Sequence, residues 1–115
     1  MTKTLTIWHN PRCSKSRQTL QLLEERGATL DVRRYLDDPP NAGEIRDVLK
    51  KLGLRPGELV RNKESIFKEL ALDGADDDAL IDAMAAHPKL IERPVVIAED
   101  AAAIGRPPED VLRLL

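Results

Sequence analysis

The sequence predicts a small α/β domain in which a mixed β-sheet is flanked by helices. An alternating apolar segment at residues 5–8 precedes a helix-like segment and then a second strand-like segment at residues 30–36. A β-branched run at residues 95–97 is followed by a short segment at 101–104, an order typical of an antiparallel hairpin. Because a strand–helix–strand order favours parallel pairing, these four segments together predict a mixed sheet.

Capping residues and glycines delimit the two helices predicted next to these strands. The segment 14–26 contains no glycine or proline, and Gly27 is placed to end that helix. Asn41 followed by Glu44 resembles a capping box, and the helix behind it has apolar residues at i, i+3, i+4 and i+7. Gly53 is placed to end this second helix.

The middle of the chain predicts a helical insertion between the second and third strands. Residues 56–61 and 65–70 suit short helical turns, and Asp76 can cap a helix that runs to about residue 86. Near the C-terminus, the Pro107-Pro108 pair opens a last helix with acidic residues in its first turn. The predicted order is therefore βαβα, a helical insertion, and then ββα.

Length and composition point to one domain and exclude several function classes. The chain has 115 residues and a formal net charge of -2, which does not favour binding to nucleic acid or to a membrane surface. No apolar run approaches the roughly 20 residues of a membrane span. The N-terminus has no signal-peptide apolar region, so we expect a cytoplasmic protein.

The only cysteine, Cys13, stands where a strand passes into a helix N-terminus. Unpaired backbone N–H groups and the helix dipole there favour a thiolate and can lower a cysteine pKa from about 8.5 into the range of about 3.5–7.5. The alternative is a small buried hydrophobic residue. The polar and cationic neighbours at residues 12–17 favour the reactive thiol. Since the chain holds no second cysteine, a resolving thiol must come from another molecule.

A histidine and three arginines are candidate partners of this thiol. His9, four residues before Cys13, can supply positive charge or a hydrogen bond, or can simply pack in the loop. Arg93 and Arg106 stand at strand ends, each followed by a proline, and Arg61 ends the segment 58–61. Arginine suits a bidentate grip on phosphate-like anions, although a single arginine is more often a solvated surface charge.

The segment around Cys13 resembles the active-site loop of the glutaredoxin-linked arsenate reductases, the ArsC family. The similarity covers nearly the whole chain with matching order and spacing, and it is closest to the short, YfgD-like branch. The segments that resemble the family are His9-Asn10-Pro11-Arg12-Cys13-Ser14-Lys15-Ser16-Arg17, Leu59-Val60-Arg61-Asn62-Lys63-Glu64, His87-Pro88-Lys89-Leu90-Ile91-Glu92-Arg93-Pro94 and Ile104-Gly105-Arg106-Pro107-Pro108-Glu109.

The resemblance implies a single domain over residues 1–115 with a thioredoxin-like fold: a mixed four-stranded sheet, flanking helices and a helical insertion. It also implies a cis peptide bond before Pro94. The family's catalytic cysteine corresponds to Cys13 and its thiolate-stabilising histidine to His9. Its three anion-binding arginines correspond to Arg61, Arg93 and Arg106.

The resemblance further implies reduction of arsenate, with glutathione as co-substrate and glutaredoxin as partner protein. We expect no bound cofactor, no metal and a monomeric protein. Two other functions are compatible with the same sequence features. One is a glutaredoxin-like thiol transferase that acts on glutathionylated substrates. The other is a regulator similar to the Spx proteins, which contact RNA polymerase; those commonly carry a Cys-x-x-Cys switch where this chain has Ser16.

Overall fold

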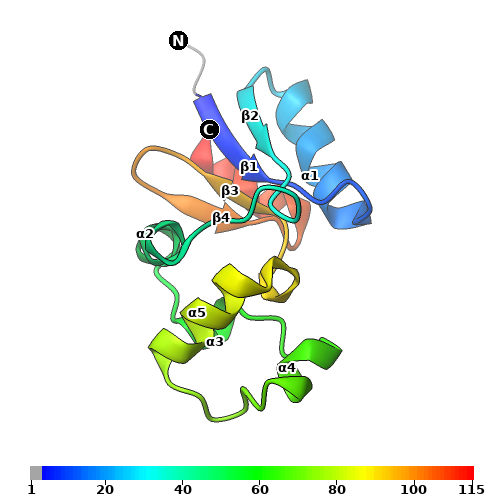
Figure 1. Cartoon of the computed structure of the whole chain (residues 1–115). Coiled ribbons are helices and arrows are strands. Elements are labelled where there is room, and N and C mark those ends of the chain that lie inside the picture. Colours follow the sequence, from blue (N-terminus) through cyan, green and yellow to red (C-terminus); the bar gives the residue numbers. More distant parts are fainter. Residues whose placement is uncertain (1–3) are drawn as a thin grey trace. The chain divides into compact units, whose positions relative to one another are not determined.

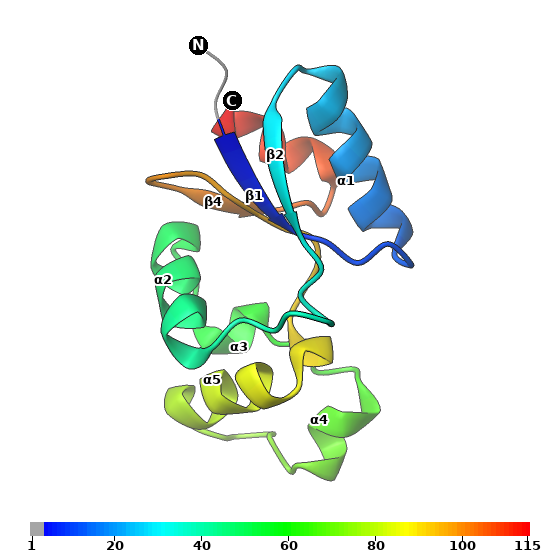
Figure 2. The same cartoon turned by 45° about the horizontal axis from the view of Figure 1, so that its top comes forward.

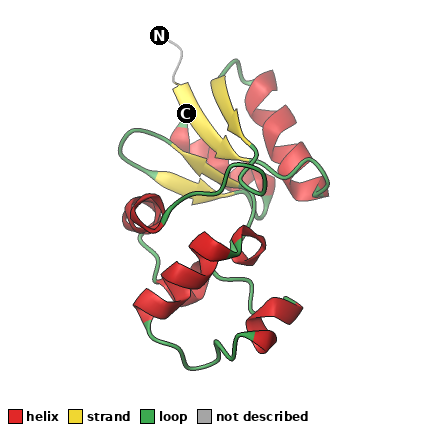
Figure 3. Cartoon of the chain, in the orientation of Figure 1, coloured by secondary structure: helices red, strands yellow, loops and turns green. Residues whose placement is uncertain are grey.

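The computed structural model describes residues 4–115, and the chain divides into two compact units. One unit consists of Met1–Asp38 together with Arg93–Leu115, and the other is Pro39–Glu92. The first unit holds all four strands, whereas the second is built from helices and loops (Figure 3). The second unit contains the helical insertion that the sequence predicts, together with the helix predicted behind Asn41.

The first unit contains a mixed four-stranded sheet with the strand order β2-β1-β3-β4 (Figure 1). Its strands are β1 (Thr4–Trp8), β2 (Thr29–Arg33), β3 (Val95–Ile97) and β4 (Ala102–Ile104). β1 pairs in parallel with β2 and antiparallel with β3, and β3 pairs antiparallel with β4. The predicted parallel pair and the predicted hairpin are therefore both confirmed.

One face of this sheet is covered by α1 (Ser14–Glu25) and by the 3₁₀ helix η2 (Pro108–Leu114) (Figure 2). Gly27, at φ 76°, follows α1 in the left-handed conformation that glycine adopts without strain. The buried side chains between the helices and the sheet come from all of these elements except β2: Leu5, Ile7, Leu23, Val96, Ala103, Val111 and Leu114. This apolar layer fixes the start of α1 relative to the ends of the strands.

Two elements of this unit differ from the prediction, one in its end and one in its helix type. β2 ends at Arg33, three residues before the predicted end at Leu36, because its partner strand ends at Trp8. Beyond that point the Arg34 carbonyl accepts a hydrogen bond from the Asp37 N–H at 3.0 Å, which forms a turn. The last helix begins where the prolines predict it, but it is a 3₁₀ helix, a geometry common in short terminal segments.

The second unit is built from four α-helices and one 3₁₀ helix: α2 (Ala42–Leu52), α3 (Pro56–Leu59), α4 (Ser65–Glu69), α5 (Asp77–Ala86) and η1 (Pro88–Leu90). The predicted capping box is present, since Asn41 Oδ1 accepts from the Glu44 N–H at 2.9 Å and Glu44 Oε1 accepts from the Asn41 N–H at 3.1 Å. Gly53, at φ 69°, ends α2. Within residues 4–115, no helix combines the length and apolar character that a membrane span requires.

Candidate active site

Cys13 is the N-cap residue of α1, with φ -94° and ψ 123°. The loop that carries it from β1 is held by backbone hydrogen bonds: the Cys13 N–H donates to the Asn10 carbonyl, and the Arg17 N–H donates to the Cys13 carbonyl, both at 3.0 Å. The thiol is partly exposed. The sequence prediction that Cys13 lies at the junction of a strand and a helix is confirmed.

The surroundings of Cys13 favour its thiolate. Burial alone would raise the pKa of the Cys13 thiol, but the backbone N–H groups of Ser16 and Lys15 and the charges of Arg93 and Arg106 act in the opposite direction. Their combined effect places the pKa below the ordinary value for cysteine. A larger fraction of the sulfur is therefore thiolate, the nucleophilic form, near neutral pH than in an ordinary cysteine.

Two of the predicted arginines lie with Cys13 in the first unit. Arg106 Nη2 is 3.8 Å from Cys13 Sγ, and Arg106 Nε donates to the Arg93 carbonyl at 2.8 Å. Arg93 is half-buried, with its Nε and Nη1 atoms screened from solvent. The peptide bond before Pro94 is cis, as the resemblance implies, and the bond between Arg106 and Pro107 is also cis. The two arginines therefore lie side by side at the open end of the β3–β4 hairpin, where the charge of each lowers the pKa of the Cys13 thiol.

His9 contacts the site through Ser16. The residue is 6% exposed, and its Nδ1 lies 2.7 Å from Ser16 Oγ. The Asn10 N–H donates to the same hydroxyl oxygen at 3.0 Å, which leaves the Ser16 hydroxyl proton to donate to Nδ1. Burial first, and then the charges of Arg34 and Arg17, lower the pKa of His9 below its usual value. A lowered pKa favours the neutral ring, which is consistent with the hydrogen-bonding role considered from the sequence more than with the positive charge.

Sequence reasoning missed two residues that position this site. Ser16, fully buried, links His9 and Asn10 to the first turn of α1. Gly105 lies so close to its neighbours that a Cβ there would be 2.5 Å from Thr19 Oγ1 and 2.8 Å from Pro94 Cγ. The signals for Gly105 were its place between a short strand and Arg106 and its presence in a segment that resembles the family.

Arg61, the third predicted arginine, lies in the second unit. Its backbone N–H donates to the Leu90 carbonyl at 2.6 Å, next to an antiparallel bridge between the preceding residue and Ile91. Its guanidinium forms ion pairs with Glu64 and, at 3.9 Å, with Glu92. The role of Arg61 in binding an anion stays a prediction.

Within the first unit, the site combines a nucleophile with groups that attract anions. The first turn of α1 presents backbone N–H groups and the positive end of the helix dipole. Arg93 and Arg106 add two guanidinium groups, which suit the oxygens of a tetrahedral anion. This arrangement can hold an oxyanion beside Cys13 Sγ and expose its central atom to attack by sulfur.

The chain is similar in sequence to one family over nearly its whole length. The model of the ArsC family matches residues 8–114. YfgD of Escherichia coli strain K12 is 52% identical over 118 residues, and the alignment covers 100% of this chain and 99% of YfgD. A protein of Neisseria meningitidis serogroup A named arsenate reductase is 50% identical, with 96% of this chain and 97% of that protein aligned.

A solved structure has the same fold. The structure titled as an arsenate reductase from Vibrio cholerae superposes with a TM-score of 0.96 at 47% sequence identity and covers 100% of both chains. Together with the observed sheet, this similarity confirms the expected thioredoxin-like architecture with a helical insertion.

Proposed function

Because the chain belongs to the ArsC family, we propose that it is an arsenate reductase in which the Cys13 thiolate attacks bound arsenate. Relatives of similar length, from Neisseria meningitidis and Vibrio cholerae, bear that name. The single observation on which the proposal rests most is the distance of 3.8 Å between Arg106 Nη2 and Cys13 Sγ, because it puts an anion-binding cation next to the nucleophile.

Arsenate would bind with its oxygens on the backbone N–H groups at the start of α1 and on Arg93 and Arg106. The family resemblance adds Arg61 as the third arginine of the anion site. These positive groups spread the charge of the anion and so reduce its repulsion of the approaching thiolate. A lowered pKa of Cys13 keeps that thiolate available at neutral pH.

The first chemical step forms a covalent bond between sulfur and arsenic. The Cys13 sulfur donates an electron pair to As(V), an arsenic–oxygen bond breaks, and the oxygen leaves as hydroxide or, after taking a proton, as water. Arsenic stays pentavalent in this adduct. Arg93 and Arg106 would stabilise the negative charge that builds up on the arsenate oxygens in the transition state.

Electrons then come from an external thiol, since Cys13 is the only cysteine of the chain. Glutathione thiolate attacks the Cys13 sulfur, a disulfide forms, and the electron pair of the sulfur–arsenic bond stays on arsenic, which leaves in the trivalent state. Glutaredoxin then takes the glutathione by thiol–disulfide exchange and regenerates the Cys13 thiolate. We place this cycle in the cytoplasm, where glutathione keeps thiols reduced.

The test is a coupled turnover assay that contains arsenate, glutathione and glutaredoxin. We expect Cys13→Ser to abolish arsenate reduction. We expect Arg106→Ala to lower kcat/KM for arsenate by about 10²-fold, the usual effect of removing one transition-state cation or donor. Arg26→Ala, which removes an exposed charge just beyond α1, is the matched control. Turnover by Cys13→Ser equal to that of the wild type would rule out the mechanism.

The same assay separates the proposal from its two rivals. A glutaredoxin-like thiol transferase would need Cys13 but would reduce a glutathionylated substrate at the same rate with or without Arg106. A regulator of the Spx type would show no turnover with either substrate. Ser16 also disfavours this last function, because a serine cannot form the second half of a disulfide switch.

A further inference from the structure

The two residues before Cys13, Pro11 and Arg12, form an exposed turn between β1 and α1. Because both residues are exposed, apolar packing contributes little to fixing the backbone of this turn. Pro11 has a restricted φ angle, but it has no N–H group to donate in a backbone hydrogen bond. The course of the chain into Cys13 therefore depends on hydrogen bonds to the other polar groups of the turn.

Side chains hold both polar groups of the peptide that joins Pro11 to Arg12. The Arg12 N–H donates to Asn10 Oδ1 at 3.0 Å, a hydrogen bond typical of an Asx turn. The carbonyl of the same peptide, on Pro11, accepts from Arg17 Nη1 at 2.9 Å. The charge of the guanidinium strengthens this second hydrogen bond. A flip of the peptide would therefore break two side-chain hydrogen bonds together.

The backbone of the same two residues, Asn10 and Arg17, also bonds to Cys13 itself. The Asn10 carbonyl accepts from the Cys13 N–H, and the Arg17 N–H donates to the Cys13 carbonyl, both at 3.0 Å. The Asn10 N–H donates to Ser16 Oγ at 3.0 Å, which ties the start of the loop to the first turn of α1. Asn10 and Arg17 thus hold the peptide before Cys13 through their side chains and Cys13 through their backbones.

This arrangement determines which N–H groups act on the sulfur. The N–H of Cys13 is occupied by Asn10, whereas the backbone N–H groups of Ser16 and Lys15 act on the thiol and lower its pKa. The Pro11–Arg12 peptide directly precedes Cys13. Its orientation therefore determines where the sulfur lies relative to the N–H groups of the helix.

We propose that Asn10 and Arg17 are positioning residues for the reaction at Cys13, because together they hold both ends of the Pro11–Arg12 peptide and so keep the sulfur at the first turn of α1. The proposal rests on the function proposed above. The charges that lower the pKa of the thiol belong to the two arginines of the β3–β4 hairpin. A loss of reactivity on removal of Arg17 would therefore act through the loop rather than through its charge.

Hydrogen exchange of the Arg12 amide, measured by NMR, tests whether the two hydrogen bonds act on one peptide. Asn10→Ala removes the acceptor, so we expect this amide to exchange about fivefold faster, the effect of one hydrogen bond of ordinary strength. Arg17→Met removes the donor at the other end of the peptide and should accelerate the same exchange at least about twofold, as for coupled groups. An unchanged rate in Arg17→Met would show that the two bonds are independent and would overturn the proposal.

Alkylation by iodoacetamide tests the consequence for the sulfur. At a pH below the midpoint of the reaction, the rate is proportional to the fraction of thiolate. We expect Asn10→Ala and Arg17→Met each to lower this rate about fivefold. Asn10→Ser should restore most of it, because the serine hydroxyl can accept the same N–H in an equivalent turn. A purely structural role would lower the free energy of unfolding and leave the alkylation rate of the folded protein unchanged.

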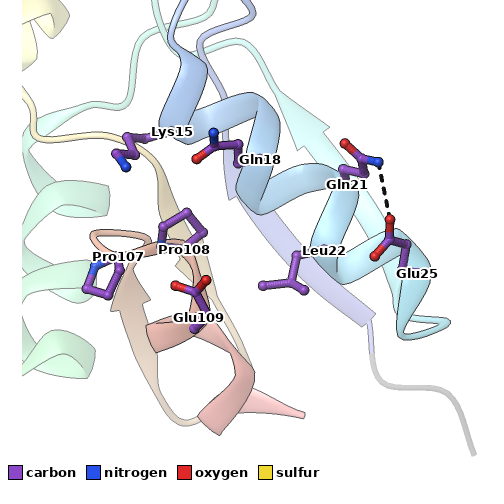
Figure 4. Close-up of a pocket in the computed structure, with 8 residues that line it drawn as sticks. All are labelled: Lys15, Gln18, Gln21, Leu22, Glu25, Pro107, Pro108 and Glu109. Atoms are coloured by element: carbon purple, nitrogen blue, oxygen red, sulfur yellow. Dashed lines mark hydrogen bonds between the residues drawn. The ribbon is translucent and has the colours of Figure 1, made fainter.

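Two exposed residues provide matched controls. Gln18 lines a groove between α1 and the first residues of η2 (Figure 4), on a face of the helix that Arg17 does not share. Gln18→Ala removes an amide there, and Arg26→Met removes a cation at the end of α1. Both variants should keep the wild-type rates. An equal fall of the alkylation rate in Arg26→Met would assign the effect of Arg17→Met to lost charge and would contradict a positioning role.

The outcomes do not depend on the arsenate assay. If Asn10→Ala and Arg17→Met keep the wild-type rates of exchange and alkylation, neither residue positions Cys13, whether or not the protein reduces arsenate. If both rates change as expected while the wild type fails to reduce arsenate, the positioning role is supported and the proposed function is wrong. The two substitutions act on opposite ends of the peptide, so each one tests the alkylation rate even if the other prevents folding.

Discussion

At the scale of single residues, Cys13 is activated by groups that come from three separate parts of the chain. Backbone N–H groups of α1 and the charges of Arg93 and Arg106 outweigh the effect of burial on its pKa. We expect the rate of alkylation of the wild-type protein by iodoacetamide to rise with pH and reach half its maximum below about 8.5, the value for a free cysteine. Arg106→Ala should move this midpoint to higher pH. A wild-type midpoint at or above the free value would contradict the activated thiolate.

His9 makes the stability of the fold sensitive to acid. Its pKa in the folded protein lies below the value of about 6.5 for an unfolded histidine. The unfolded state therefore binds more protons as the pH falls through this window, so the stabilising contribution is present above pH 6.5 and is lost below it. We expect the free energy of unfolding, measured with urea, to fall between pH 7 and pH 5.

Two histidine variants test whether His9 causes this loss of stability. His9→Asn retains an acceptor for Ser16 and does not titrate, so its free energy of unfolding should fall less between pH 7 and pH 5 than that of the wild type. His87→Asn, which changes the other histidine of the chain, should behave as the wild type does. If His9→Asn lost as much stability as the wild type, the acid sensitivity would have to arise elsewhere.

At the scale of elements, the sequence predicts helices better than strand ends. Asn41 with Glu44 and the glycines after α1 and α2 are local signals, and each one marks the observed boundary. The end of β2 is not local, because it depends on where its partner β1 ends at Trp8. The strand-like sequence pattern of β2 continues past its last paired residue because the turn that follows also contains residues that favour strands.

Gly105 shows how element packing controls the site. A Cβ at this position would lie 2.5 Å from Thr19 Oγ1 and 2.8 Å from Pro94 Cγ, so the end of β4 would have to move away from α1. We expect Gly105→Ala to lower the free energy of unfolding by about 1–3 kcal/mol, as overpacking does, and to weaken sulfate binding through displacement of Arg106.

A double-mutant cycle with Thr19 tests this account of Gly105. Thr19→Ala removes two of the three contacting atoms, so the loss of stability caused by Gly105→Ala should be smaller in that background. Gly57→Ala, where a Cβ meets nothing within 4 Å, is the control. Additive effects of the two substitutions would mean that the close approach at Gly105 does not limit the packing.

At the scale of the whole molecule, the site depends on contacts that no local pattern reveals. Cys13 and Arg106 are 93 positions apart in the sequence, where only the family resemblance predicts that they belong to one site. The contact of His9 with Ser16 spans seven residues, and among the roles considered for His9 it favours that of a hydrogen-bond partner. Residue types therefore predicted candidate site residues, whereas the three-dimensional arrangement was needed to show that Cys13 and Arg106 are in contact and that His9 contacts Ser16.

The proposed role of Arg61 in binding the anion can be tested by measuring the thermal stability of the whole protein. A ligand that binds only the folded state raises the free energy of unfolding, by about 2.7 kcal/mol at a concentration one hundred times its Kd. We expect arsenate or sulfate to raise the melting temperature of the wild type. The increase should be smaller for Arg61→Ala and for Arg106→Ala, and unchanged for Arg55→Ala, which removes an exposed cation of the second unit.

The variants should be compared by the increase in melting temperature that the anion causes, rather than by the melting temperature itself. Arg61 forms ion pairs with Glu64 and Glu92, so its removal leaves two carboxylates without that partner and changes stability even in the absence of anion. The change in stability caused by the lost ion pairs is present with and without arsenate. It therefore cancels when the melting temperature without the anion is subtracted from that with the anion. An anion-induced increase equal to the wild-type value in Arg61→Ala would show that Arg61 holds the second unit together and does not bind the anion.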